Sequence, residues 1–385
     1  MKKQPLFSAF IVLWCISFVA AVSGTGVSEE DQGTNRGDGR RLFETETFGG
    51  NGRTCLTCHS RKTGTVSPKD AQERFQANPH DPLFIHDGSD DGHGNGVTRM
   101  LADATILMNI ALPSNVRLAN SDTRFVTVFR GIPTTLNTPA LDPVLMLDGR
   151  QPTLELQAGG AIHDHAQAPA FPALADLEAI RQFQKTEAFF SSPELLFAAF
   201  GGPNPRLPRG NTASERRGRR FFEDVPPDPA AGFKPGLCAH CHSGTLLNQT
   251  NEFAPLFVGA PIPTGSRFVN ILVGFFNEAG NTVQDFVFNA GTNHEIPVSS
   301  TDPGRALITG NIDDLDAFKI SQLRGIRHTA PYFHDNSAKT LADVAAHYSR
   351  FFRFVTAGLG PGGAPLISLT PQDEADMVAF MKLLD

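Results

Sequence analysis

Two copies of one five-residue pattern constrain this chain more than any other feature of its sequence. They read Cys55-Leu56-Thr57-Cys58-His59 and Cys238-Ala239-His240-Cys241-His242. Two residues between the cysteines place both sulfurs on one side of a single turn, and the next residue points its imidazole to the same side. This spacing lets two thiols meet the two vinyl groups of one porphyrin while the histidine binds its iron. The sequence therefore predicts two covalently bound haems c, with His59 and His242 as proximal iron ligands.

Two other chemistries use paired cysteines. A CxxC pair also holds zinc or carries out thiol redox reactions. A shared zinc site would have to bring two distant pairs together, and it would not need the histidine that directly follows each pair. Apart from Cys15 near the N-terminus, every cysteine lies in one of the two motifs, so none is left for disulfides. Haem attachment is therefore the favoured interpretation.

The first residues are typical of an export signal. Lys2 and Lys3 precede an uncharged apolar run, 7–22, which ends in small residues suited to cleavage. A membrane anchor is disfavoured, because the run is short for a span and no stop-transfer pattern follows. We expect residues 1–23 to be a signal peptide and 24–38 a flexible leader. The mature protein is then expected in the periplasm, with no need for a membrane.

Charge and aromatic content narrow the partners. The formal net charge is −7, which argues against nucleic acid and permits a basic protein partner. The chain has 31 Phe but only 2 Tyr and 1 Trp, a balance that suits an apolar cofactor pocket better than a wet interface.

The chain repeats a series of landmarks. Four stretches form two matched pairs, one before and one after the CxxCH motifs: 39–44 with 218–223, and 148–150 with 335–337. Matched landmarks in the same order indicate a duplication. We expect a mainly α fold of two tandem cytochrome c-like haem domains, 39–205 and 206–385, with long loops and a few short strands.

Helical signals occur in both halves. The predicted helical segments are 173–199 with a break at 191–193, 214–222, 340–352, and a last helix that opens at Thr370. Residues 340–352 carry an apolar stripe. Thr370-Pro371-Gln372-Asp373 combines an N-cap, a proline at the first helical position and an acidic residue three after the cap. Residues 252–310 are expected to hold short strands or an irregular insertion.

Five further stretches match the motifs of one known family: Pro133-Thr134-Thr135-Leu136-Asn137, Asp148-Gly149-Arg150, Thr153-Leu154-Glu155-Leu156-Gln157, Leu323-Arg324 and Thr329-Ala330-Pro331-Tyr332-Phe333-His334-Asp335. With the CxxCH motifs they resemble the bacterial di-haem cytochrome c peroxidases and the related MauG-type enzymes. The stretches between the motifs look unlike that family. The resemblance implies that hydrogen peroxide reacts at the N-terminal haem and that the C-terminal haem relays electrons. It also implies a small cytochrome c or a cupredoxin as electron donor.

The resemblance suggests a second ligand for the C-terminal haem iron. In the peroxidases it is a Met fourteen residues after the counterpart of His334; this chain has Tyr348 there, as MauG-type enzymes do. A phenolate favours ferric iron, whereas Met raises the reduction potential. Alternatively, Tyr348 belongs to the apolar core, or its neighbour His347 is the ligand. Adjacent helical residues point about 100° apart, so only one can face the haem, and we expect Tyr348.

The expected peroxide pocket departs from the family. Gln157 matches a pocket glutamine, but the family's catalytic glutamate ten residues later is here Gln167. Cleavage of the O–O bond needs a group that moves a proton between the two oxygens, and an amide cannot do so. His163 and His165 lie close by. Either could be the acid–base group or could bind the iron; alternatively, both are surface-loop histidines.

Two more family features are altered. The tryptophan that lies between the haems in relatives is Leu147 here. Thr329 and Pro331 match positions whose carbonyls bind an interdomain Ca²⁺ in relatives. A further position of that site, an asparagine in relatives, is Gly131 here. Calcium is therefore a candidate ligand, without a complete match.

The histidines after the first motif receive no iron-binding role. In the peroxidases a histidine shortly after the first CxxCH motif caps the resting N-terminal haem. The same spacing from the motif leads to Phe75 in this chain. His80, His86 and His93 are therefore unassigned, and 86–91 is expected to be an exposed polar loop.

Three functions are compatible with these features. The first is a peroxidase that reduces hydrogen peroxide with electrons from a small redox protein. The second is a MauG-type oxidase of a protein or organic substrate, which Tyr348 favours and the missing tryptophan weakens. The third is a non-catalytic di-haem electron carrier, which the missing glutamate favours. A homodimer is compatible with all three.

Overall fold

The computed structural model describes residues 38–255, 262–291 and 294–385. The expected signal peptide, and the expected leader up to residue 37, lie outside the described residues. Within those ranges, no helix combines the length and the apolar character that crossing a membrane requires.

Helices joined by long loops dominate the first half of the chain: α2 (Cys55–Cys58), α3 (Pro68–Ala77), α4 (Thr98–Asp103), α5 (Leu154–Gly160), α6 (Leu174–Thr186) and α7 (Pro193–Ala199). Residues 38–44 are also helical. α5 runs directly into a π-helical turn, Ala161–His165. The predicted break between α6 and α7 is confirmed, because Ser192 caps α7 and Pro193 is its first residue.

The second half has the same character: α8 (Ala213–Arg219), α10 (Val273–Phe276), α11 (Ala306–Thr309), α12 (Leu341–Val355) and α13 (Pro371–Met381). Thr340 and Thr370 cap α12 and α13, and the side chain three residues later bonds back to each cap. These capping boxes satisfy backbone donors that a helix start leaves free. The helices predicted from Thr340 and Thr370 are therefore confirmed.

A β-hairpin in the first half is absent from the sequence-based expectations. β1 (Thr105–Ala111) pairs antiparallel with β3 (Phe125–Gly131). Along β3, Val126 and Val128 are buried while Phe125 and Thr127 are exposed. Such alternation is the usual sign of a half-buried strand.

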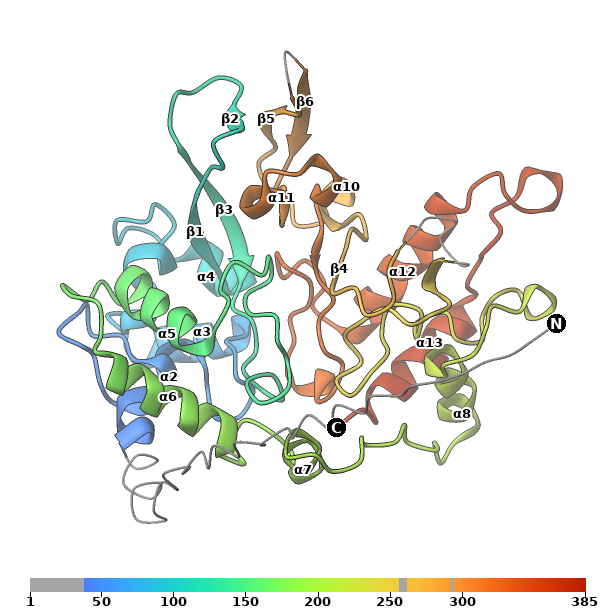
Figure 1. Ribbon diagram of the computed structural model, residues 1–385, viewed down its shortest axis with the longest axis horizontal. Helices are drawn as coiled ribbons and strands as arrows, with labels where there is room; N and C mark the ends of the chain where they lie inside the picture. The colour runs from blue at the N-terminus through green and yellow to red at the C-terminus, as the bar shows by residue number, and fades with distance from the viewer. Residues whose placement is uncertain (1–37, 256–261, 292–293) are drawn as a thin grey trace, which may run out of the picture.

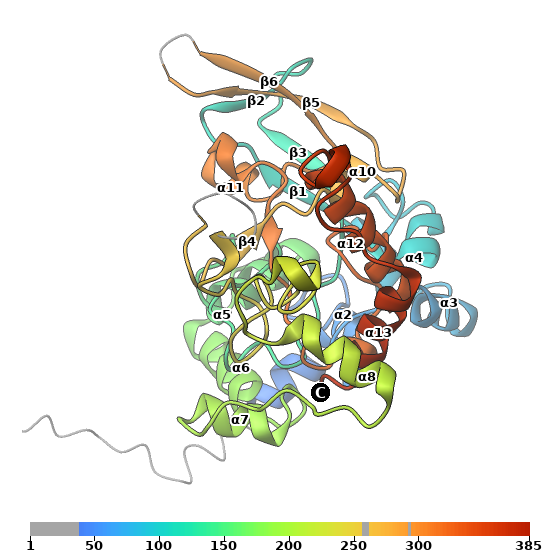
Figure 2. The same cartoon turned by 90° about the vertical axis from the view of Figure 1, so that its right-hand side faces the viewer.

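A three-stranded antiparallel sheet joins the two halves. Its strands are, in spatial order, β2 (Val116–Leu118), β5 (Gln284–Asn289) and β6 (Glu295–Ser300). β4 (Phe268–Val269) pairs with β7 (Phe318–Lys319). Short strands are thus the correct alternative for residues 252–310. The three-stranded sheet lies at one end of the molecule, above the two halves (Figures 1 and 2).

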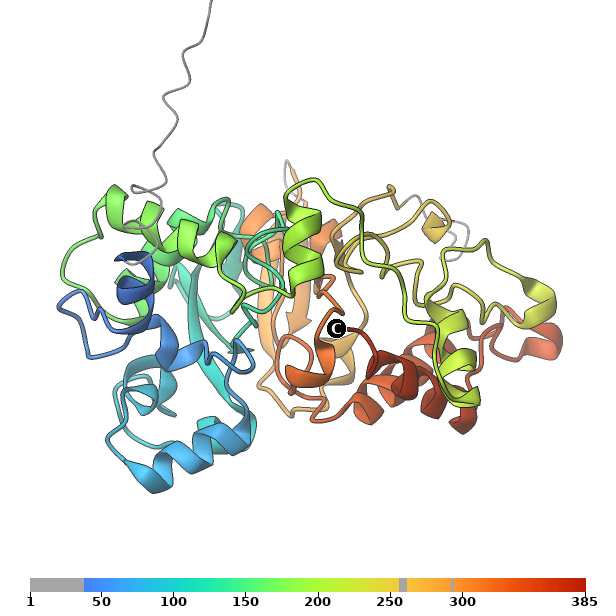
Figure 3. The ribbon, with the colours of Figure 1, turned by 90° about the horizontal axis from the view of Figure 1, so that it is seen from below.

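One helix crossing occurs in both halves. A Cβ atom on Gly39 would lie 2.1 Å from the Ala179 carbonyl oxygen of α6, and one on Gly218 would lie 1.9 Å from the Asp376 carbonyl oxygen of α13. Only glycine permits such a close approach of two backbones. The matched Gly-Arg-Arg stretches therefore place equivalent helix contacts in the two halves, which lie side by side in Figure 3.

Among the described residues, buried apolar side chains form three clusters. One lies within the first half and contains Leu42 and Phe183, and another lies within the second half and contains Phe380. The third surrounds the β1–β3 hairpin but includes Phe286 and Phe288 of β5. The second half of the chain thus completes a core that begins in the first.

Candidate functional site

The first CxxCH motif forms a single helical turn. The backbone N–H of His59 donates to the Cys55 carbonyl at 2.9 Å. The His59 ring nitrogen Nδ1 lies 2.8 Å from the carbonyl oxygen of Gly64 and donates to it, which leaves Nε2 available as a ligand.

The second motif repeats this geometry. The N–H of His242 donates to the Cys238 carbonyl at 2.8 Å, and His242 Nδ1 donates to the Leu247 carbonyl at 2.9 Å. Both acceptors lie five residues after their histidine. A ligating imidazole usually donates its other nitrogen in this way, since that fixes its tautomer and orientation.

Burial sets the protonation of both motifs. It raises the pKa of Cys55 to about 12 and of Cys241 to about 11, so these thiols do not ionise at neutral pH. It lowers the pKa of His242 to about 4 and also lowers that of His59, which keeps both imidazoles neutral. Thiol redox sites depend on thiolates, whereas thioether formation and neutral imidazole ligands fit these surroundings.

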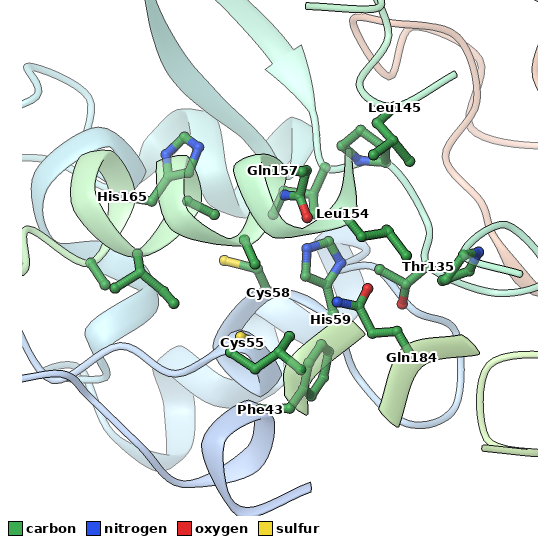
Figure 4. Close-up of a pocket in the computed structure, with 18 of the residues that line it drawn as sticks. Phe43, Cys55, Cys58, His59, Thr135, Leu145, Leu154, Gln157, His165 and Gln184 are labelled. Carbon is green, nitrogen blue, oxygen red and sulfur yellow. The ribbon is translucent and has the colours of Figure 1, made fainter. Parts of the chain in front are cut away.

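The first motif opens into a large apolar pocket, which we call the first haem pocket (Figure 4). Its empty space, including the open mouth, is about 1240 Å³. Lining side chains come from residues 38–44, α2, α5 and its π-helical turn, α6 and the 132–146 loop, among them Phe43, Ile132, Leu145, Leu154, Ile162 and Ile180. Thr135 also lines the pocket, and its buried Oγ1 has no hydrogen-bond partner in the part of the chain that the structure describes. Cavity, sulfurs and orphaned hydroxyl together fit a haem with its propionates.

The surroundings of the second motif also fit a haem. Asn248 directly follows Leu247, and its buried Nδ2 has no partner among the described residues. The neighbouring guanidinium of Arg267 donates to Asn248 Oδ1 at 2.5 Å. An unused donor next to a cation suits a carboxylate such as a propionate. Among the described residues, no group of three or more His, Cys, Asp or Glu side chains could hold a metal ion.

Two predicted distal residues come together in the first haem pocket. Gln157 lies on α5 and His165 on the π-helical turn, and both line the pocket beside Cys58 and His59. Figure 4 shows them on the helix that crosses it. Because the π-turn widens the helix, it changes which side chains face the pocket; such turns are frequent at functional sites.

The other two predicted distal residues lie elsewhere. His163 is exposed, and its Nδ1 lies 2.8 Å from the Asp164 carboxylate. Gln167 is also exposed and accepts a hydrogen bond from Asn51 Nδ2 at 3.1 Å. Neither side chain lines the first haem pocket.

His165 is held by two residues that sequence reasoning missed. The Asp87 carboxylate lies 2.5 Å from His165 Nδ1 and 2.5 Å from Arg53 Nη1. Asp87 is only 6% exposed, so the expectation of an exposed polar loop at 86–91 is wrong there. The loop folds inward because the buried Arg53 requires an anion. No sequence pattern connects Arg53 with Asp87.

Near the second motif, Tyr348 and His347 point in different directions. Tyr348 packs with Cys238 against the buried apolar cluster of the second half, and burial, followed by the neighbouring Cys241 and Cys238 thiols, raises the pKa of its phenol. His347 instead donates from Nε2 to the Ile271 carbonyl at 2.9 Å and packs on Phe333.

The candidate calcium position has a changed environment. The N–H of Gly131 donates to the His334 carbonyl at 2.7 Å, and a Cβ at Gly131 would lie 2.2 Å from Asn336 Oδ1. Asn336 thus fills the space beside Gly131, near Thr329 and Pro331 in sequence.

Leu147 stands where relatives have a tryptophan. Its carbonyl accepts a hydrogen bond from the Lys319 N–H at 2.7 Å.

Comparisons with known proteins find similarity to a cytochrome-c peroxidase. No protein-family model matches the chain. The curated cytochrome-c peroxidase IdrP1 of Denitromonas iodatirespirans is 25% identical over 212 residues, which are 50% of this chain and 54% of that protein. The match therefore spans about half the length of the curated relative.

A solved structure shows the fold. A MauG-like protein associated with microbial copper homeostasis superposes with a TM-score of 0.50 and 22% identity, over 93% of this chain and 88% of that one. The diheme peroxidase BthA from Burkholderia thailandensis gives a TM-score of 0.45 and 14% identity, over 91% and 86%. The chain has the fold of the MauG-like protein, and it resembles the bacterial di-haem cytochrome c peroxidase and MauG family.

Proposed function

We propose that this chain is a di-haem c-type cytochrome that reduces hydrogen peroxide at the haem attached to Cys55 and Cys58. The observation that carries the proposal is the first haem pocket, in which the CxxCH motif shares one cavity with Gln157 and His165. An apolar cavity with a few convergent polar groups is the usual form of a small-molecule site. A haem held by His59 would supply the iron that takes up peroxide and the electrons that break its O–O bond.

The chain's own side chains would orient the peroxide and move its proton. The Gln157 amide can donate a hydrogen bond to a peroxide oxygen. His165 Nε2 has no protein partner among the described residues, and it can accept the proton of one oxygen and return it to the other, which leaves as water. Each peroxide takes up two electrons and two protons and yields two water molecules.

Electrons would enter through the haem attached to Cys238 and Cys241, with His242 and Tyr348 as iron ligands. The closeness of Tyr348 to both thiols supports this pair, since His347 is bonded to a backbone carbonyl. A small cytochrome c or a cupredoxin is the proposed donor.

We also propose the organisation expected from the sequence. Residues 1–23 would be a cleaved signal peptide, the mature protein would be periplasmic, and 39–205 and 206–385 would be two cytochrome c-like domains. The repeated glycine contact of Gly39 and Gly218 supports the duplication.

Calcium would be bound, if at all, through the carbonyls of Thr329 and Pro331. Calcium prefers six to eight oxygen ligands, and Asn336 is the polar side chain that stands beside Gly131. A chelator should lower the melting temperature of the holoprotein if calcium bridges this region, and an unchanged melting temperature would remove calcium from the proposal.

The test uses the full chain produced with a working cytochrome assembly system. We expect the mass of two haems, a high-spin ferric signal in the electron paramagnetic resonance spectrum, and peroxide consumption with a reduced small cytochrome. The double substitution C238A/C241A should lose one haem and the donor-dependent turnover. Two low-spin irons without peroxide consumption would indicate an electron carrier instead.

Tyr348 favours one alternative, a MauG-type oxidase of a protein or organic substrate, because a phenolate ligand stabilises oxidised iron. Peroxide consumption that requires such a substrate, and not a reduced cytochrome, would favour this alternative.

A further inference from the structure

We propose that Asp87 is a positioning residue that fixes His165 as the proton-transfer group of the first haem pocket, and that Arg53 holds Asp87 in place. The inference deepens the proposed peroxide chemistry and rests on it. His165, held by Asp87, would take the place of the family's catalytic glutamate. The residue at the glutamate position, Gln167, lies outside the pocket.

Both oxygens of Asp87 are occupied by these two partners. Oδ2 accepts from His165 Nδ1, and Oδ1 accepts from Arg53 Nη1, each at 2.5 Å. Asp87 and Arg53 are 6% and 3% exposed. Burial alone would raise the pKa of Asp87, but His165 and Arg53 lower it below its ordinary value. The carboxylate therefore remains an anion inside the protein.

Arg53 anchors this carboxylate to the backbone of two segments. Its guanidinium donates to the carbonyls of Pro82 at 2.8 Å, Ile85 at 2.6 Å and His165 at 3.1 Å. Because Arg53 lies two residues before Cys55, the network is tied to the haem attachment turn. An arginine with several fixed acceptors has little freedom to move, so Asp87 is held as well.

The arrangement decides which nitrogen of His165 carries the proton. An anionic acceptor at Nδ1 favours the tautomer with hydrogen on that nitrogen, which leaves Nε2 with a free lone pair. His165 lines the first haem pocket, and its Nε2 bonds to no described protein atom. A base with a free lone pair in the pocket is what proton transfer between two peroxide oxygens requires.

The chain offers a matched control. His163 and Asp164 form a second histidine–aspartate pair on the same turn, with 2.8 Å between Nδ1 and Oδ1. Their side chains are 57% and 71% exposed and do not line the pocket. Changes to this pair test whether any His–Asp pair nearby has the same effect.

Cyanide provides a readout that does not depend on turnover. Hydrogen cyanide must lose its proton to bind ferric iron as cyanide, so a base in the pocket accelerates binding. In the holoprotein at neutral pH, His165→Gln should slow cyanide association on the order of 10²-fold. Asp87→Asn should slow it at least about tenfold, because the Asn amide can turn its NH₂ toward Nδ1 and favour the opposite tautomer. Asp164→Asn should leave the rate unchanged.

A double variant tests whether Asp87 acts through His165. In the His165→Gln background, Asp87→Asn should cause no further slowing. Haem stoichiometry and melting temperature report whether each variant folds. If Asp87→Asn does not fold, Asp87→Glu keeps the charge beside Arg53 but displaces the carboxylate, and it should slow cyanide binding as well.

The outcomes separate this inference from the proposed function. Peroxide turnover with normal cyanide rates in Asp87→Asn and His165→Gln would overturn the inference and leave the peroxidase. Equal slowing by Asp164→Asn, or additive slowing in the double variant, would also overturn it. A wild-type protein that neither binds cyanide nor consumes peroxide would overturn both.

Discussion

At the scale of single residues, one hydrogen bond explains how each proximal histidine is prepared. His59 donates to Gly64 and His242 to Leu247, each five residues downstream. Both bonds fix Nδ1 as the donor and leave Nε2 available to bind the iron of the proposed haem. Identical offsets in two copies mean that the loop after each motif, and not only the motif, orients the histidine.

Tyr348 carries a prediction about the second haem. Tyr348→Met should raise the reduction potential of that haem, because a thioether favours ferrous iron more than a phenolate does. The rise should be a fraction of the roughly 0.8 V range that axial ligands span. Spectroelectrochemical titration of the two haems measures it.

His347→Gln is the control for this substitution. His347 bonds to the Ile271 carbonyl and packs on Phe333. Its substitution should leave the potential and spectrum of the second haem close to those of the wild type. A large shift in this variant, with none in Tyr348→Met, would mean that His347 is the ligand.

At the scale of elements, the close contact of α8 with α13 predicts a steric effect. Gly218→Val should destabilise the protein by about 1–3 kcal/mol, because a Cβ would lie 1.9 Å from the Asp376 carbonyl oxygen. Urea unfolding of the holoprotein measures the change. Ala213→Val, at an exposed position of the same helix, should stay within about 0.5 kcal/mol. Equal effects of the two substitutions would contradict the contact.

The start of α13 gives a second prediction at this scale. Thr370→Ala removes the hydroxyl that accepts from the Asp373 N–H. The expected loss is about 1 kcal/mol of unfolding free energy. Thr370→Ser, which keeps the hydroxyl, should retain most of the stability. A full loss in the serine variant would show that the methyl group matters more than the cap.

At the scale of the whole molecule, a buried ion cluster joins the two halves. Arg130 of β3 forms two hydrogen bonds with Asp302, at 2.7 and 2.9 Å, and one with Asp148 at 2.5 Å. These three side chains are nearly inaccessible, and Arg150 completes the cluster through Asp148. Charges buried this deeply depend on one another for compensation.

Breaking the cluster should therefore be costly. Arg130→Met leaves Asp302 and part of Asp148 without a cation and should destabilise the protein by about 3–5 kcal/mol. The exposed pair of Arg117 and Glu295 is the matched control, and Arg117→Ala should cost less than about 1 kcal/mol. Thermal and urea unfolding should rank the variants in this order, and equal losses would contradict it.

The same cluster predicts acid sensitivity. Burial raises the pKa of Asp148, but Arg130 and Arg150 lower it below its ordinary value of 3.8. A carboxylate whose pKa is lower when folded stabilises the fold above its unfolded pKa, and this contribution is lost as the pH falls through the folded value. Unfolding free energy should thus decline as the pH falls below about 5. Asp148→Asn should weaken that decline, and an unchanged slope would exclude Asp148 as a source.

Local signals in the sequence were sufficient for several helix boundaries and for the two CxxCH turns. The caps at Thr340 and Thr370, the break at Ser192 and the two CxxCH turns are set within four or five residues, so reading the chain in order finds them. The β1–β3 hairpin was missed although its alternation is visible. Its partner strands are separated by a long connection, and no short turn marks the pairing.

The distal side of the first haem pocket shows the limit of such reading. His163 and His165 are equivalent in sequence, two residues apart, and Gln167 follows at the same interval. The π-turn puts His165 into the pocket, and the other two side chains are exposed. A two-residue step changes direction by different amounts in α- and π-helical backbone, so spacing alone could not choose among them.

The sequence by itself determined the two CxxCH turns, the histidine that follows each cysteine pair and the starts of α12 and α13, because those features depend on neighbours along the chain. The tertiary structure alone decided that Asp87 meets His165, that Arg130 reaches Asp302, and that Tyr348 rather than His347 approaches the second motif. These contacts join residues far apart in sequence or depend on which helix face is buried. Charge burial and charge compensation settle these contacts when distant segments pack. No local sequence pattern predicts them.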